Sequence, residues 1–120
     1  MAAYAIAHLR DPKPIPEIFE YLERIDSTLE PYRGRFIIHG TTAEVLEGAW
    51  PGAVVAIEFP TVADAKGWYE SSDYQKILPL RANHIRSDVI LVEGVEAGHN
   101  SAQMAARLRE ETTTTIAGTP

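Results

Sequence analysis

Hydrophobic positions along this chain fall into strand-like runs separated by helix-like stripes. The runs that are typical of β-strands are 2–9, 35–39, 53–59 and 87–95. After the first run, apolar residues recur at helical spacing, and the helix they predict ends at Pro31. Its predicted inward stripe consists of Ile15, Ile18, Phe19, Leu22, Ile25 and Leu29.

A second helical region is predicted between the last two strands. Thr61 with Asp64 three residues later resembles a capping box, and Trp68 belongs to the inward stripe of that helix. Ser71 or Ser72 is expected to cap a further helical piece, in which Pro79 removes one backbone hydrogen bond.

A short extra strand is predicted at 44–47, paired with 35–39 as a hairpin. The order of elements is therefore β-α-β-β-α-β with one added strand. This is the ferredoxin-like α+β pattern, in which one antiparallel sheet carries two helices on one face. We assign it to a single domain, residues 1–95.

The predicted strands do not alternate between apolar and polar residues. Phe36-Ile37-Ile38 and the stretches 53–57 and 89–92 are continuous apolar runs, whereas a sheet with one solvated face should alternate. We therefore expect both sheet faces to be buried, one by helices and the other by a second copy of the chain in a sheet-to-sheet homodimer. The alternative is an unusually apolar open face, which would promote aggregation.

The C-terminal segment 96–120 has no strong apolar period. A helix over 102–111 is possible by pattern, with Met104 and Leu108 on one side, although ten residues alone make a marginal helix in water. Two interpretations stay open: a flexible tail, or an arm that docks on a partner subunit.

Composition narrows the classes of partner. The net charge is −6 and the pI about 5.1, which argues against nucleic acid and anionic membranes as partners. The chain has no cysteine, so disulfides and thiolate nucleophiles are excluded, in keeping with a cytoplasmic location. We expect no secretory signal and no membrane span, because no apolar stretch is long enough.

Arg81 is the first candidate for a functional residue. Tyr74, Ile77, Leu78 and Arg81 follow i, i+3, i+4 and i+7 spacing, so an inward helix face carries a cation. A buried charge needs a partner. Two alternatives are open: a structural salt bridge to an internal acid such as Glu58 or Glu93, or a ligand carboxylate or enolate held bidentately.

Several stretches together resemble a known family. The strings EVLEGAW, AIEFPTVADAKGWYESSDYQKILPLR and VILVEG are similar to the uncharacterised dimeric α+β barrels called domain of unknown function thirteen-thirty, over residues 3–95. The resemblance implies sheet-to-sheet dimers and no settled activity. This chain has Arg33 where relatives often have the first of two glycines, and His39 where they often have arginine, so the charge at that position would depend on pH.

Analogy with other dimeric α+β barrels, which include monooxygenases, isomerases and dehydratases, implies cofactor-independent chemistry on a small anionic or phenolic molecule. The candidate bases are His39 and His84, and the candidate ligand contacts are Arg81, Tyr69, Tyr74 and Trp50. We expect no metal site, because no histidine pair has ligand spacing, and no cofactor motif is present. The alternative is a non-catalytic ligand-binding or homodimeric interaction module.

Overall fold

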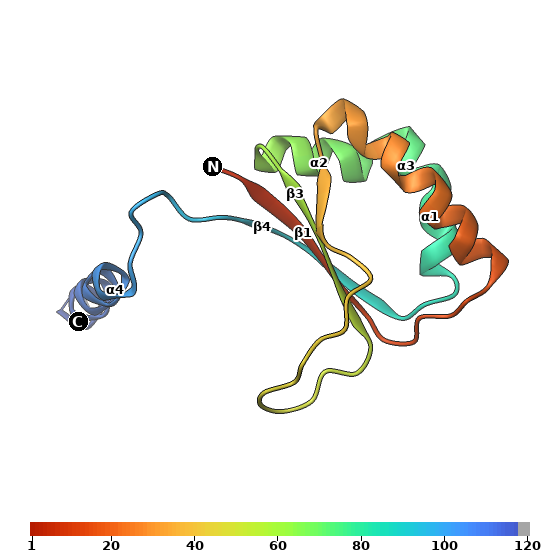
Figure 1. Cartoon of the computed structure of the whole chain (residues 1–120). Helices are drawn as coiled ribbons and strands as arrows, with labels where there is room; N and C mark the ends of the chain where they lie inside the picture. Colours follow the sequence, from red (N-terminus) through yellow and green to blue (C-terminus); the bar gives the residue numbers. More distant parts are fainter. Residues whose placement is uncertain (118–120) are drawn as a thin grey trace.

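The computed structural model describes residues 1–117, with side-chain burial up to residue 113, and shows a helical layer on one face of a sheet (Figure 1). Within these residues the sheet is antiparallel, with strand order β2-β3-β1-β4. The elements are β1 (Ala3–Leu9), α1 (Pro16–Leu29), the 3-10 helix η1 (Glu30–Tyr32), β2 (Arg35–Ile38), β3 (Ala53–Phe59), α2 (Val62–Glu70), α3 (Ser72–Ala82), β4 (Ser87–Glu93) and α4 (Ser101–Ala117). The predicted ferredoxin-like α+β fold is confirmed.

The predicted helix starts are also confirmed. The Thr61 hydroxyl accepts a hydrogen bond from the backbone N–H of Asp64 (3.1 Å) and donates to the Asp64 carboxylate (3.0 Å). Ser71 caps α3 by accepting from the N–H of Tyr74 at 3.2 Å. These caps satisfy N–H groups that the first turns of α2 and α3 would otherwise leave unpaired.

The predicted strand at 44–47 is wrong. Residues 39–52, here called the 39–52 loop, form no ladder with β2 or β3. Gly40 and Gly48 take positive φ angles of 75°, which break an extended backbone on either side of 44–47. At the loop tip Leu46 is 85 % exposed and Val45 is 48 % exposed, so the described part of their own chain leaves both side chains accessible.

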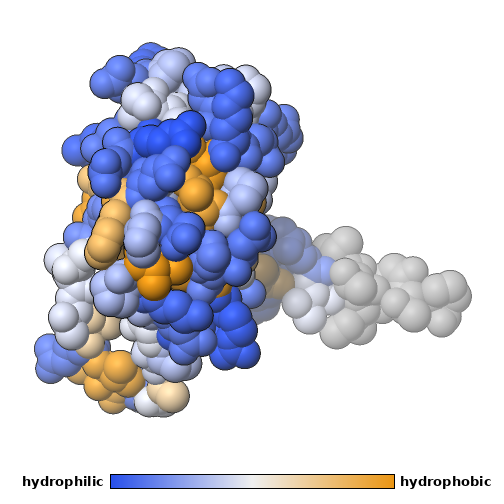
Figure 2. Space-filling view, turned by 90° about the vertical axis from the view of Figure 1, so that its right-hand side faces the viewer, coloured by the Kyte–Doolittle hydropathy of each residue, from blue (hydrophilic) through white to orange (hydrophobic). Residues whose placement is uncertain are grey.

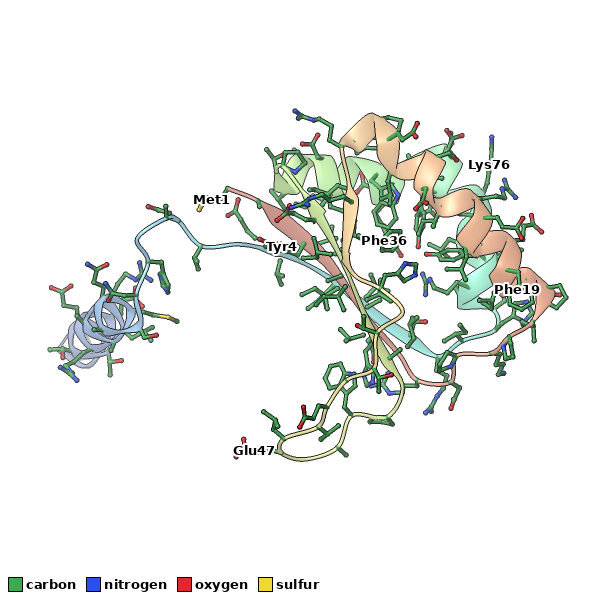
Figure 3. The ribbon with its side chains drawn as sticks, in the orientation of Figure 1. Met1, Tyr4, Phe19, Phe36, Glu47 and Lys76 are labelled. Carbon is green, nitrogen blue, oxygen red and sulfur yellow. The ribbon has the colours of Figure 1, made fainter. Side chains whose placement is uncertain are left out.

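The predicted stripe of α1 is wrong in part. The residues that α1 buries are Tyr21, Ile25, Thr28 and Leu29, whereas Phe19 and Leu22 are exposed. Figure 3 shows Phe19 at the outer end of α1, pointing away from the sheet. The helix is rotated because two polar side chains face inward: the Tyr21 hydroxyl contacts that of Tyr74, and Thr28 accepts from the Trp68 indole. A pattern of apolar residues alone does not predict such hydrogen-bonded polar pairs.

Arg33 adopts the left-handed conformation that glycine would favour, with φ 57°. It follows η1, and its guanidinium lies 3.3 Å from the Asp64 carboxylate. The next residue, Gly34, has no room for a side chain, because a Cβ there would lie 2.6 Å from the ring of Phe59. This turn is therefore a place where two glycines would suit the backbone and this chain supplies one.

The two faces of the sheet differ in what covers them. The registers place Ala5 of β1 beside Ile57 and Leu91, on the face that the helices cover. The opposite face, here called the open face, carries apolar side chains over which no described helix lies, and Ile38, Ile90 and Val92 among them are exposed. The residues of the open face include Tyr4, Ile6, Ile38, Val54, Ala56, Ile90 and Val92.

Helix α4 is longer than the predicted 102–111 and begins at a cap, since the Asn100 side chain accepts from the N–H of Gln103 at 2.8 Å. Every residue from 101 to 113 is exposed. Figure 1 shows α4 and the 39–52 loop on the open-face side of the sheet. The end of the predicted tail, 118–120, lies outside the described residues. None of the described helices is long and apolar enough to span a membrane.

Candidate functional site

A cavity of about 80 Å³ lies between the sheet and the helices. Its floor is the centre of β1, where Ala5 and Ala7 present methyl groups only and so leave space beneath the helices. That volume is several times the roughly 10–15 Å³ that one water needs. The outer surface of the helical layer is mostly hydrophilic, with hydrophobic atoms visible between the polar ones (Figure 2). The remaining lining residues are Leu9, Ile18, Tyr21, Leu22, Ile25, Phe36, His39, Val55, Ile57, Trp68, Tyr74, Arg81, Ile85 and Val89.

Arg81 reaches this cavity from the last turn of α3, and its side chain is buried, with 7 % of the residue exposed. Its Nη2 donates to the Tyr74 hydroxyl at 3.4 Å, and its guanidinium carbon lies 5.8 Å from the centre of the Tyr21 ring. Among the described residues no carboxylate lies within ion-pair distance of Arg81. Glu58, one expected partner, instead pairs with Arg35 at 2.7 Å.

Arg81 stays charged despite its burial. Desolvation disfavours the guanidinium, but the phenol oxygens of Tyr74 and Tyr21 outweigh it and raise the pKa of Arg81 above its ordinary value. Burial likewise raises the pKa of Tyr21 well above its ordinary value, with Tyr74 adding to the effect. At neutral pH the site therefore holds a cation and protonated Tyr21.

Tyr21 and Tyr74 share a hydrogen bond of 2.8 Å between their hydroxyls. That bond uses one of the two phenol protons, and Arg81 only donates. One phenol O–H is therefore left to donate into the cavity, next to the remaining guanidinium N–H groups. Because the cavity lining includes no carboxylate, the arrangement is complementary to a negatively charged oxygen.

Trp68 and Tyr69 support the site from α2. The Trp68 ring lies 4.1 Å from that of Tyr74, and its indole N–H donates to Thr28 at 3.0 Å, so it has no free donor. Tyr69 packs behind, with its ring 5.6 Å from the Tyr74 ring, and it does not line the cavity. The structure thus brings Tyr74 and Arg81 together and places Tyr69 one layer away.

His39 supplies the imidazole of the cavity lining. It follows β2 directly, is exposed, and stacks on Phe36 with ring centres 4.0 Å apart. Together with the exposed Leu22 of α1 it forms the outer part of the lining. His39 therefore lies at the outer, solvent-exposed part of the cavity.

The other two predicted residues lie away from the cavity. His84 is half-buried just after α3 and does not line the cavity. Its backbone N–H donates to the Arg81 carbonyl at 3.1 Å. Trp50 belongs to the 39–52 loop and stacks on His8 of β1, with ring centres 4.3 Å apart. The histidine ring is fixed by a second contact, from its Nε2 to the Pro51 carbonyl at 2.6 Å.

Tyr21 is the site residue that sequence reasoning missed. It stands three residues after Ile18 and four before Ile25, so its position on the inward stripe was readable from spacing. What the spacing does not reveal is that a tyrosine from α1 and one from α3 meet there.

An open groove of about 420 Å³ lies on the other side of Arg81. Its walls carry Arg10 and Asp88, which are paired across β1 and β4. A hydrogen bond from Arg10 is the main cause of a lowered pKa at the Asp88 carboxyl. Among the described residues, no group of three His, Asp or Glu side chains could hold a metal ion.

The fold is that of a ferredoxin-like α+β protein, with a cavity between its sheet and its helices. Residues 2–95 match the family described as Domain of unknown function (DUF1330), and the chain belongs to that family, as the resemblance predicted.

Comparison with solved structures agrees on the fold. The RPA0582 protein of unknown function from Rhodopseudomonas palustris is 17 % identical, with a TM-score of 0.60, over 79 % of this chain and 83 % of that one. A dimeric ferredoxin-like protein of unknown function from Jannaschia sp. CCS1 is 11 % identical, with a TM-score of 0.61, over 78 % of this chain and 100 % of that one. No curated protein matches the chain.

Proposed function

We propose that the cavity binds a small organic anion, either a carboxylate or the enolate or phenolate form of a small molecule. The observation that carries this is Arg81, a buried cation at a cavity with no carboxylate within ion-pair distance among the described residues. Keeping a charge in such a place is costly unless an anion is bound there. The ligand's apolar body would lie over Ala5 and Ala7, and its oxygen would accept from Arg81 and a phenol O–H.

We further propose that the chain works as a homodimer, in which the open faces of two copies pack together. The open face is apolar, with Ile90 52 % exposed, and a patch of this kind marks an interaction surface. The Jannaschia relative is described as dimeric, which supports this proposal.

The proposed chemistry is proton transfer without a cofactor, with His39 as the base. It lines the cavity and is exposed to water, whereas Tyr21 holds its proton too tightly to act as a base. A non-catalytic binding protein would use the same cavity and not need His39.

A thermal-shift screen against small organic acids and phenols tests the binding site, because a ligand that binds only the folded state raises its stability. Hits should disappear in Arg81→Met, which removes the cation, and in Ala7→Leu, which fills the cavity. They should remain in the matched control Arg24→Met, an exposed arginine of α1. Hits that survive in Arg81→Met would contradict the proposed anion contact.

A proton-exchange experiment with each ligand found in the screen then distinguishes catalysis from binding. In D₂O, NMR should show deuterium replacing the ligand's C–H next to its acidic group, and His39→Gln should stop this exchange while the thermal shift remains. If wild-type protein causes no exchange, the cavity binds its ligand without proton transfer, and the binding-module alternative holds.

A further inference from the structure

Helix α4 presents a small apolar surface with Arg107 beside it and Glu111 one turn beyond. Met104 and Leu108, one turn apart, are 43 % and 49 % exposed, and Arg107 lies beside them at i+3 from Met104. The helix touches nothing that would bury them, since residues 101–113 are all exposed. A single helix of this length is marginal in water, and the run of threonines in its second half has low helix propensity. Packing on a partner would therefore stabilise α4.

The tip of the 39–52 loop has the complementary composition. Residues 44–47 read Glu-Val-Leu-Glu, so an exposed apolar pair is flanked by two acids, and the loop has no lysine or arginine. Figure 3 shows Glu47 at the tip, far from the helical layer.

These two surfaces leave the sheet on the same side but at opposite ends of its strands (Figure 1). The segment that leads to α4 follows Glu93, which pairs with Ala3, whereas the loop joins β3 at Ala53, which pairs with Leu9. The length of β1, roughly 20 Å for the six steps of about 3.3 Å from its first to its last residue, separates the two ends.

We propose that α4 of one chain packs on residues 44–47 of a second copy. The inference rests on the proposed homodimer. A twofold axis that lies between two packed open faces and runs across the strands would bring each α4 to the same end of the sheet as the partner's loop tip. Because α4 follows β4 and the loop joins β2 to β3, residues 94–100 and the loop would together span the width of the sheet between them. Met104 and Leu108 then meet Val45 and Leu46, and Arg107 meets the flanking acids, so the contact is made twice per dimer.

Disulfide trapping tests this contact, because the chain has no cysteine of its own. Met104→Cys and Leu46→Cys chains, coexpressed and oxidised, should give a disulfide-linked dimer on a non-reducing gel, and Leu108→Cys should serve in place of Met104→Cys. Lys66→Cys, an exposed position on α2 in the helical layer, replaces Leu46→Cys as the control and should give none. An equally strong cross-link with Lys66→Cys in place of Leu46→Cys would overturn the proposal.

Charge reversal gives a second readout by sedimentation. Arg107→Glu should raise the dimer dissociation constant about three- to fivefold, the size expected for a partly exposed pair, and Glu44→Lys with Glu47→Lys in the same chain should restore it. Arg109→Glu, on the same helix but off this face, is the control and should change nothing. A dimer without cross-links and with an unchanged dissociation constant overturns the arm contact and leaves the homodimer standing, whereas a wild-type monomer overturns both.

Discussion

The two faces of the sheet use similar apolar residues for different purposes. On the helical face, large rings from α1, α2 and α3 close over β1, and the hollow that remains holds one buried arginine. On the open face, residues such as Ile38 and Ile90, 39 % and 52 % exposed, have no helix over them in the described chain. A continuous apolar strand therefore predicts that both faces are to be buried and does not say by what.

The largest expected effect concerns the core beneath the helical face of the sheet. Trp68 is 2 % exposed and contacts Phe59 and Tyr74. Trp68→Ala should lower the free energy of unfolding by about 3–5 kcal/mol, because it leaves a cavity and removes the indole N–H that donates to the Thr28 hydroxyl. Urea unfolding followed by circular dichroism measures this. The control Trp50→Ala, at the exposed tryptophan of the loop, should cost no more than about 1 kcal/mol, and equal losses in the two variants would mean that the core is misassigned.

The second effect concerns the open face and leaves the fold intact. Ile90→Asp should raise the dimer dissociation constant by at least about 30-fold, since an unpaired carboxylate would be buried in the proposed interface. Sedimentation velocity over a dilution series measures it. Phe19→Asp is the matched control, because Phe19 is equally apolar and 49 % exposed but belongs to the helical layer. If only Phe19→Asp dissociated the dimer, the interface would lie on the helical layer and not on the open face.

A smaller effect is expected inside the cavity. Tyr21→Phe should cost about 0.5–1.5 kcal/mol at neutral pH, through the lost hydrogen bond to Tyr74. The pKa of Tyr21 is raised on folding, so its contribution is complete below its ordinary pKa of 10.0 and is lost as pH rises above that value. Unfolding measured from pH 8 to 11 should show wild type and variant converging above about pH 10. A constant difference across that range would mean that Tyr21 ionises freely in the fold.

The smallest effect lies at the edge of the sheet. Arg10 lowers the pKa of Asp88 on folding, so their pairing contributes stability above the ordinary value of 3.8, and this contribution is lost as pH falls below it. Asp88→Asn should remove that part of the acid sensitivity, and thermal unfolding between pH 2 and 6 measures it. With Arg10→Gln already present, the same substitution should change nothing. A full effect in the double variant would assign the acid sensitivity to another carboxylate.

Sequence reasoning succeeded where a local pattern decides the structure. The strand 53–59 is a single apolar run, and the inward position of Arg81 follows from its spacing to Tyr74 and Ile77. It failed where distant residues decide. Glu-Val-Leu-Glu is compatible with a strand, and only the missing neighbour makes it a loop. The partner of Arg81 was equally unreadable, because Glu58 is taken by Arg35 of the next strand. The Tyr21 contact depends on how α1 is rotated against α3.

The two tryptophans make the protein its own optical reporter. Trp68 lines the cavity in a dry setting, so its emission should be blue-shifted and should respond to a bound aromatic acid and to unfolding. Trp50, in the 39–52 loop, is partly in water, so its emission should be red-shifted and should respond to what covers the open-face side. Replacing either one with phenylalanine would leave a single tryptophan. Occupancy of the cavity and association of the chains would then be read separately, from the emission of two unlabelled single-tryptophan variants.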